Sequence, residues 1–174
     1  EQVYPEDNVE VTSLVQRCRW LRQVLPDADL PDLSDAVLQE VCFELCRQCR
    51  SLADLRKAPW KDWIAARFSP AQRQFLDREA PERVVVPSGS SIRLEYEQGK
   101  APILAVKIQE VFSWQSVPRL AMGKVPILLH LLAPNMRPQQ ITDDLANFWA
   151  VGYSLVKNDW KRRYPKHAWP DDPA

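Results

Sequence analysis

The sequence lacks the elements that support nucleotide hydrolysis and membrane insertion. None of its four glycines begins a P-loop, because Gly99-Lys100 and Gly123-Lys124 lack both a following hydroxyl residue and a second glycine five residues upstream. No apolar run approaches the roughly 20 residues that a bilayer-spanning helix needs. We therefore expect no ATP hydrolysis by this chain alone and no contact with the interior of a membrane.

Catalytic side chains are also scarce. The two histidines, His130 and His167, lie far along the chain from every cysteine, and no set of nucleophile, base and orienting group is recognisable. The adjacent acids Asp143 and Asp144 would face different directions on a helix, and the first helical turn is where acidic side chains are favourable. We therefore expect no catalytic residue in the chain, and whether the whole protein is an enzyme stays open.

An excess of charge of one sign is absent from the chain as a whole. Its 23 basic and 23 acidic residues cancel, so the composition does not indicate a generally cationic protein. The two halves differ, however, because residues 1–82 contain 11 basic and 15 acidic side chains, and residues 83–174 contain 12 and 8. Any surface that binds anions is therefore expected in the second half.

The start of the chain has no initiator methionine, basic segment or apolar segment of a signal peptide, so we expect a fragment or a processed chain. The four cysteines, Cys18, Cys42, Cys46 and Cys49, all lie in the first 50 residues, which is a poor disulfide framework and indicates a reducing, cytoplasmic setting. Their helical spacing leaves two interpretations open: small buried apolar side chains, which we favour, or ligands of Zn²⁺ or a cluster. No metal site is assigned, and any other role of these cysteines stays open.

The first half is predicted to be a helical subdomain, residues 1–82, with about four helices. The first runs from Val11 to Leu25 with Thr12 or Ser13 as N-cap, and Pro26 ends it. The second begins at Ser34 and buries a stripe that continues through Cys46, Cys49 and Leu52. The third begins near Pro59 and contains Trp60, Trp63, Ile64 and Phe68. The fourth begins with the capping-box pattern Ser69-Pro70-Ala71-Gln72.

The second half is predicted to be an α+β subdomain, residues 83–174, with a small ββαβα-like unit and an extended basic and aromatic tail. Short β-rich runs at 84–86 and 92–96 flank a Ser-Gly turn and predict a hairpin. Residues 104–112 show helical spacing, and the apolar run 125–132 predicts a buried strand. Thr142 is expected to cap a long helix that ends near Arg163, and its predicted apolar stripe consists of Ile141, Leu145, Phe148, Trp149, Gly152, Leu155, Val156 and Trp160.

The C-terminal end combines cations with aromatic side chains. Residues 157–167 contain five basic side chains and one acid, Asp159, and Trp160, Tyr164 and the nearby Trp169 are interleaved with them. Cations engage phosphates and aromatic rings stack on unpaired bases, so contact with single-stranded RNA is one interpretation. The other is a solvated basic helix end, because cations complement the negative helix terminus and the aromatic residues could be packing anchors.

Several strings in one order resemble the C-terminal region of the HrpB-type bacterial ATP-dependent helicases of the DEAH/RHA class. They are Val86-Pro-Ser-Gly-Ser90, Leu104-Ala-Val-Lys-Ile-Gln-Glu-Val-Phe112, Val125-Pro-Ile-Leu-Leu129, Leu145-Ala-Asn-Phe-Trp149 and Arg163-Tyr-Pro-Lys-His-Ala-Trp-Pro-Asp-Asp-Pro173. The resemblance implies a parent protein with two RecA-like ATPase domains that use ATP and Mg²⁺. No residue of this chain matches an ATP-binding or hydrolytic position, so no cofactor is assigned to it.

Together these observations predict a non-catalytic accessory domain of an HrpB-like RNA helicase. Its expected partners are the helicase core of the same polypeptide and, through its cations, single-stranded RNA. The candidate RNA-binding residues, chosen from charge and position, are Arg162, Arg163, Lys166 and His167, with Arg93 and Arg137 behind them. The alternative is a protein-interaction or regulatory scaffold that uses exposed tryptophans and contacts no nucleic acid.

Overall fold

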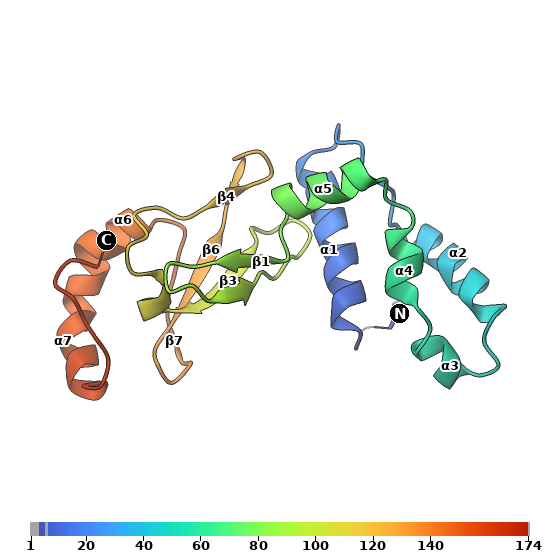
Figure 1. Ribbon diagram of the computed structural model, residues 1–174. Coiled ribbons are helices and arrows are strands. Elements are labelled where there is room, and N and C mark those ends of the chain that lie inside the picture. The colour runs from blue at the N-terminus through green and yellow to red at the C-terminus, as the bar shows by residue number, and fades with distance from the viewer. Residues whose placement is uncertain (1–3, 6, 174) are drawn as a thin grey trace. The chain divides into compact units, whose positions relative to one another are not determined.

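The computed structural model describes residues 4, 5 and 7–173 of the chain (Figure 1). The described chain divides into two compact units. Unit 1 contains the residues up to Glu82 together with Tyr96–Lys100, and unit 2 contains Arg83–Glu95 and the residues from Ala101 onward. The division into a helical subdomain, residues 1–82, and an α+β subdomain, residues 83–174, stays a prediction. Within the described residues, no helix combines the length and apolar character that crossing a membrane requires.

Unit 1 is helical, with α1 at Val9–Val24, α2 at Asp35–Cys46, α3 at Leu52–Arg56, α4 at Trp60–Ala65 and α5 at Pro70–Glu79. The described residues thus form five helices here, where about four were predicted, because α3 was merged into the preceding helix. The N-cap of α1 is Asn8, whose Oδ1 accepts a hydrogen bond from the Val11 backbone N–H at 3.2 Å, so Thr12 and Ser13 lie inside the helix. The capping box of Ser69 and Gln72 is confirmed.

The core of unit 1 is an apolar cluster centred on α1, which contacts both α4 and α5, while α2 packs on α4. The side chains that form it are fully or almost fully buried: Val11, Val15, Cys18, Leu21, Leu38, Val41, Leu45, Trp60, Ile64 and Leu76. The segment Tyr96–Lys100 joins this core through Trp20, which donates from its indole nitrogen to the Lys100 carbonyl at 2.8 Å. The Trp20 and Tyr96 rings meet edge to face at 5.2 Å, and burial raises the pKa of Tyr96.

The apolar stripe predicted for α2 is confirmed only as far as Leu45. Cys46 is the last residue of the helix and is exposed, Cys49 follows it in a turn, and Leu52 is 78% exposed on α3. The sequence spacing continued the helical period, but the chain leaves the helix after Cys46, where the Gln48 backbone N–H turns back to the Leu45 carbonyl. Residues beyond that point no longer lie on the buried face.

Unit 2 begins with the predicted hairpin, which is confirmed. Its strands β1, Arg83–Val85, and β2, Ser91–Arg93, pair antiparallel with Val84 opposite Ile92. Gly89 has φ +87° in the connecting turn, a left-handed conformation that glycine adopts without steric cost. A hairpin turn therefore explains the Ser-Gly segment.

The main sheet of unit 2 has the strand order β3-β6-β7, formed by Ile103–Lys107, Leu128–Leu132 and Pro138–Thr142. Strand β6 is central, with β3 parallel to it and β7 antiparallel on its other side. The helix predicted for residues 104–112 was wrong: these residues form β3 and a short 3₁₀ helix, Ile108–Val111. Leu104, Ile108 and Val111 are all buried, so their spacing could not distinguish the two structures, and pairing with β6 decides for a strand.

Strands β4, Arg119–Leu120, and β5, Val125–Pro126, form a separate two-stranded ribbon. The apolar run 125–132 therefore contributes to two sheets, because Val125 and Pro126 pair with β4 and only residues 128–132 form the predicted buried strand. Strand β7 was not predicted at all. Its sequence, Pro138-Gln-Gln-Ile-Thr142, carries only one large apolar side chain.

The C-terminal helical stretch consists of α6, Leu145–Asn147, a π-helical turn, Phe148–Gly152, and α7, Tyr153–Arg163. Its N-cap is Asp144, whose Oδ1 accepts from the Asn147 backbone N–H at 3.0 Å, while Thr142 still belongs to β7. The predicted cap at Thr142 was therefore two residues too early, and the predicted end at Arg163 is confirmed. Ile141 and Leu155, expected in the buried stripe, are 56% and 77% exposed.

The α+β class and the long C-terminal helical stretch are confirmed, whereas the ββαβα order was wrong in its details. Unit 2 has seven strands among its described residues, and its only helix before α6 is a single 3₁₀ turn. The strands are short and the pairing of β3 with β6 is long-range, which is why the periodicity of single segments did not show the main sheet.

Candidate nucleic-acid interface

The last turn of α7 presents two exposed arginines that share one carboxylate. An Nη atom of Arg162 lies 2.6 Å from Oδ1 of Asp159, and an Nη atom of Arg163 lies 3.6 Å from Oδ2. Their side chains are 83% and 63% exposed. Exposed ion pairs of this kind contribute only about 0–1 kcal/mol, so a phosphate can replace Asp159 as the partner at little cost. The two guanidinium groups are therefore available to an anion.

The neighbouring cations divide into exposed and engaged side chains. Lys161, Lys166 and His167 are exposed, the last two in the segment that follows α7. Lys157 is largely buried and forms an ion pair with Asp171, whose pKa is lowered by the hydrogen bond and charge of that lysine. Four of the five cations in residues 157–167 are thus presented to solvent, and Lys157 is used inside the unit. We call Lys161, Arg162, Arg163, Lys166 and His167 the basic helix end.

Arg137 is connected to the basic helix end through the sheet. It is exposed in the turn that leads into β7, two residues before Gln139. Gln139 accepts a hydrogen bond at its Oε1 from the indole nitrogen of Trp160 at 3.1 Å. Because Trp160 lies on α7 just before Arg162, this contact holds the beginning of β7 beside the last turns of the helix.

Arg93 lies elsewhere in unit 2, on β2. It is half-buried and pairs across the hairpin with Arg83, whose own guanidinium donates to the Ser91 carbonyl at 2.6 Å. The structure therefore groups Arg137 with the four C-terminal candidates, whereas Arg93 belongs to the hairpin.

The tryptophans among these cations are packing anchors, which is one of the two interpretations that the sequence left open. Trp160 and Trp169 are 5% and 7% exposed, and their rings pack against each other at 5.4 Å. The same cluster contains Phe112, Trp149, Tyr153 and Tyr164. Helical spacing showed that these residues share a face, but only the fold showed that the face is covered.

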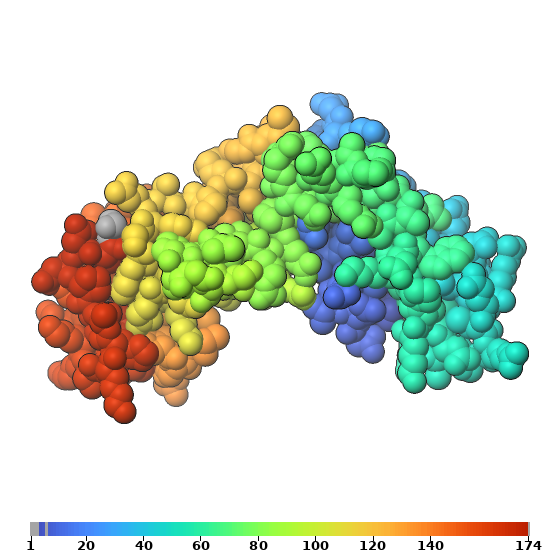
Figure 2. Space-filling model, in the orientation of Figure 1, coloured from blue at the N-terminus to red at the C-terminus, as the bar shows by residue number. Residues whose placement is uncertain are grey.

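The residues after α7 form a strap that runs back along the helix (Figure 1). Pro170 accepts at its carbonyl from the Tyr153 hydroxyl at 3.0 Å, and Pro173 accepts from the Ser113 backbone N–H at 2.8 Å. Burial raises the pKa of Tyr153 to about 12, and the nearby Asp171 adds to the shift. In the space-filling view the red side chains of α7 and the strap form one continuous surface (Figure 2). The strap therefore fixes Lys166 and His167 beside the arginines.

The cysteines do not form a metal centre in the part of the chain that the structure describes, where no group of three potential ligands is suitably placed. All four are free thiols. Cys18 is fully buried, with its thiol 3.5 Å from the Pro31 carbonyl oxygen, whereas Cys42 and Cys49 are half-buried and Cys46 is exposed. The expectation that all four act as buried apolar residues is therefore confirmed for Cys18 and wrong for Cys46.

This difference predicts selective alkylation of the native protein. Burial raises the pKa of Cys18 to about 11, which alone lowers its thiolate fraction about a hundredfold relative to a solvent-exposed thiol. We expect iodoacetamide at pH 7.5 to modify Cys46 first and to leave Cys18 unmodified over the same time, as followed by peptide mass spectrometry. The rates should become similar in concentrated guanidinium. Equal rates for Cys18 and Cys46 in the native protein would contradict the burial of Cys18.

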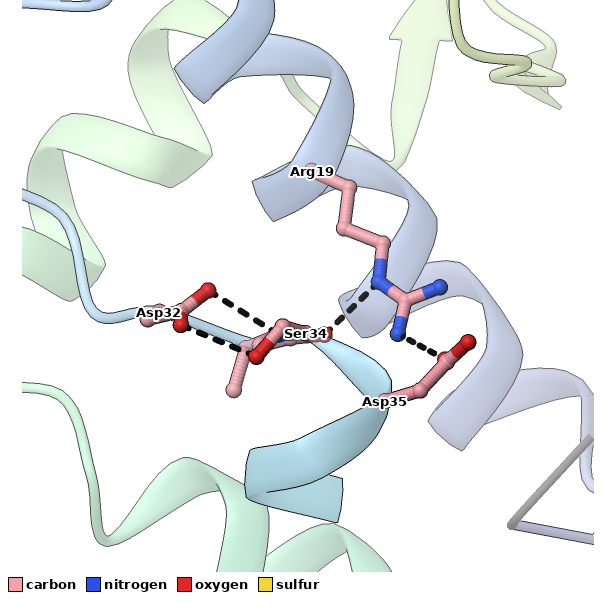
Figure 3. Close-up of polar contacts among 5 residues, drawn as sticks. Arg19, Asp32, Ser34 and Asp35 are labelled. Atoms are coloured by element: carbon pink, nitrogen blue, oxygen red, sulfur yellow. Dashed lines mark hydrogen bonds and ion pairs between the residues drawn. The ribbon is translucent and has the colours of Figure 1, made fainter.

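Unit 1 contains a polar hollow beside α1 and the start of α2, and its hydrogen bonds join these two helices. Arg19 donates from Nε to the Leu33 carbonyl at 2.7 Å and from an Nη atom to Asp35 at 2.7 Å, which ties α1 to the start of α2 (Figure 3). Asp32 accepts from both the backbone N–H and the hydroxyl of Ser34, and these hydrogen bonds lower its pKa. The charged groups of this hollow thus satisfy one another, and we assign no ligand to it.

Comparison with known proteins identifies the family. The family model described as ATP-dependent helicase C-terminal, HrpB_C, matches residues 42–173. The chain belongs to the HrpB C-terminal family. It is also 39% identical over 165 residues to the ATP-dependent RNA helicase HrpB of Escherichia coli strain K12, which covers 92% of the chain and 20% of that relative.

Solved HrpB structures show the same fold. The crystal structure of the E. coli DExH-box NTPase HrpB matches with a TM-score of 0.87 and 36% identity, over 96% of this chain and 21% of that one. A second crystal structure, of the E. coli DEAH/RHA helicase HrpB, matches with a TM-score of 0.74 and 34% identity, over 93% of this chain and 21% of that one. The chain thus spans about a fifth of the length of the HrpB proteins that it matches.

Proposed function

We propose that the chain is a non-catalytic accessory domain of an HrpB-type helicase, which packs on the helicase core of the same polypeptide and contacts single-stranded RNA. The observation that carries the RNA contact is the basic helix end, where Arg162 and Arg163 are exposed and share only Asp159. Membership of the HrpB C-terminal family supports the attachment to a helicase core. ATP and Mg²⁺ belong to that core in this proposal, and the free thiols fit a reducing, cytoplasmic compartment.

The RNA contact is expected to depend mainly on phosphates, because the tryptophans of this region are buried. Neutralising about three phosphates of a single strand gives a slope of roughly −2 for log affinity against log salt. Raising the salt from about 50 to 200 mM should therefore weaken binding roughly twentyfold. The measurement is fluorescence anisotropy of a labelled short RNA titrated with the 174-residue chain at both salt concentrations.

Charge reversal at the basic helix end tests the location of this contact. The variant Arg162→Glu/Arg163→Glu is expected to bind RNA about 10- to 100-fold more weakly and to show a smaller salt slope, because two phosphate contacts become repulsive. The matched control is Arg47→Glu/Arg50→Glu, which makes the same change in charge at two exposed arginines of unit 1. An equal loss in both variants, or no binding by the wild type at low salt, would contradict the proposal.

Packing on the helicase core is tested separately. The core of the parent helicase, expressed without this region, should form a complex with the chain added in trans, as measured by gel filtration, and its ATPase rate should change. Formation of a complex without any RNA affinity would favour the alternative function, a protein-interaction domain. Exposed apolar side chains on unit 1, with Phe43 71% and Leu52 78% exposed, support that alternative better than the tryptophans, none of which is exposed.

A further inference from the structure

A groove in unit 2 lies between β7 and the C-terminal helical stretch, next to the basic helix end. It encloses about 210 Å³, less than the roughly 300–1,000 Å³ typical of sites for drug-sized ligands. Its walls combine amide and hydroxyl groups from β7 with an apolar helical face. The lining residues are Gln139, Gln140, Thr142, Asn147, Phe148, Val151, Gly152, Val156 and Trp160.

The π-helical turn Phe148–Gly152 shapes this groove. Phe148 packs so closely on Gly152 that a Cβ atom there would lie 2.8 Å from its Cδ2 atom, so only glycine fits without a shift. Phe148 is nearly buried, whereas Val151, in the same turn, is 55% exposed. Single π-helical turns inside helices are frequent at functional sites, and here the turn places flat apolar surface opposite β7.

The polar groups of the groove differ in how they are used. Gln139 and Thr142 have local partners, because Gln139 accepts from Trp160 and the Thr142 hydroxyl contacts the backbone of Asp144. Gln140 and Asn147 are exposed at the rim, and the hydrogen bond from the Gln140 amide nitrogen to the Ile141 carbonyl is long at 3.4 Å. Each amide offers a donor and an acceptor side by side, which is the pattern that pairs with the edge of a nucleobase.

Cations stand at the end of the groove where β7 meets α7. Arg137 precedes Gln139 by two residues, and Arg162 and Arg163 follow Trp160 by two and three residues. The hydrogen bond between Gln139 and Trp160 holds these two segments together. A flat polar ring would therefore meet the amides and the apolar face of the groove, and an adjacent negative charge would meet these arginines, all within unit 2.

We propose that the groove between β7 and α7 binds one unpaired base of a single-stranded RNA, while the basic helix end and Arg137 contact the adjoining phosphates. The inference rests on the proposed RNA contact and adds the base as a recognised group. The ring would lie against Val151 and Val156, and its edge would meet the amides of Gln140 and Asn147. Sequence-specific recognition of single-stranded RNA combines contact with the face of an unstacked base and hydrogen bonds to its edges.

An RNA that keeps the phosphates but lacks bases tests this inference. The full 174-residue chain is titrated with a labelled short RNA and with an abasic strand of the same length and charge. Because the abasic strand keeps every phosphate but loses the apolar contacts and edge hydrogen bonds of the accommodated base, it should bind at least about fivefold more weakly. Equal affinity for the two strands would overturn the base groove and leave the phosphate contact standing, whereas no binding of either strand would overturn both.

Two rim variants locate the effect. Gln140→Ala and Asn147→Ala are each expected to weaken binding of the natural strand and to leave the affinity for the abasic strand unchanged. The ratio of the two affinities should therefore fall. The matched control is Gln74→Ala, an exposed glutamine on α5 of unit 1, which should leave both affinities unchanged. Circular dichroism confirms that each variant is folded. An undiminished advantage of the natural strand in both rim variants would overturn the assignment of the groove.

Discussion

Replacing Trp169 by alanine is expected to destabilise unit 2 by about 3–5 kcal/mol, the usual loss for a large buried aromatic side chain. Trp169 is only 7% exposed and packs against Phe112, Trp160 and Tyr164. Its indole nitrogen also donates to the Tyr164 carbonyl at 3.1 Å, and this bond closes the turn after α7. Removing the ring leaves a cavity between the strap and the helix.

Urea denaturation followed by circular dichroism measures the loss, and hydrogen exchange shows whether it is confined to unit 2. Trp169→Phe should lose less, because it keeps an aromatic ring in the cluster. His167→Ala, an exposed change in the same strap, should alter stability by less than about 0.5 kcal/mol. A Trp169→Ala variant as stable as His167→Ala would show that the strap is not a packed part of the unit.

The Trp169 variant also has a functional consequence. The strap carries Lys166 and His167, and its contacts hold them beside Arg162 and Arg163. Loss of the anchor is expected to weaken the proposed RNA contact by releasing those residues, whereas Arg162→Glu/Arg163→Glu is expected to weaken it with a much smaller loss of stability. Measured together, the two variants separate the packing role of the aromatic residues from the contact role of the cations.

The second large effect is expected in unit 1, where Arg17→Met should cost about 2–3 kcal/mol. The Arg17 side chain is only 6% exposed. Its guanidinium group donates to the Ala80 carbonyl at 2.6 Å and to Asp77 at 2.5 Å. Methionine fills much of the same space but leaves the carbonyl of Ala80 without this donor. A buried acceptor that loses its partner costs about 1–3 kcal/mol, and the lost charge-assisted bond to Asp77 adds to it.

Urea denaturation again gives the free energy of unfolding, and the comparison variant is Asp77→Ala. Because the Asp77 side chain is 61% exposed, its removal should cost less than about 1 kcal/mol and leave the bond between Arg17 and Ala80 intact. The two variants thus distinguish the buried hydrogen bond from the surface ion pair. Equal losses in both would indicate that the ion pair, and not the carbonyl contact, stabilises the junction of α1 and α5.

The sequence predicted most of the helices of unit 1 because their signals are local. Ser69 and Gln72 form a capping box, Pro26 follows the first helix, and apolar residues recur with helical spacing along α1. It failed at α3, where five residues with an exposed Leu52 continued the apparent stripe of α2. Periodicity shows which residues share a face, but it does not show where the chain leaves the helix.

Unit 2 was harder to predict because its main sheet depends on one long-range pairing, that of β3 with β6. Residues 103–107 become a strand by pairing with residues 128–132, and β7 forms on the other side of the same strand with few apolar residues of its own. For this reason the groove beside β7, with Gln140 and Asn147, had no signal in the sequence. Arg137 was chosen from its charge alone, and the structure supplies the reason that it lies near α7.

The sequence by itself determined the α+β class, the hairpin, the end of the last helix at Arg163 and the cluster of cations there, because each depends on neighbours within a few turns. It also carried the strings that place the chain in the HrpB C-terminal family. Only the tertiary structure decided which tryptophans are covered, which cations are engaged, and that β7 and α7 enclose a groove. Burial and ion pairing depend on contacts between segments that are distant in sequence. The helical or strand spacing of a single segment therefore does not show them.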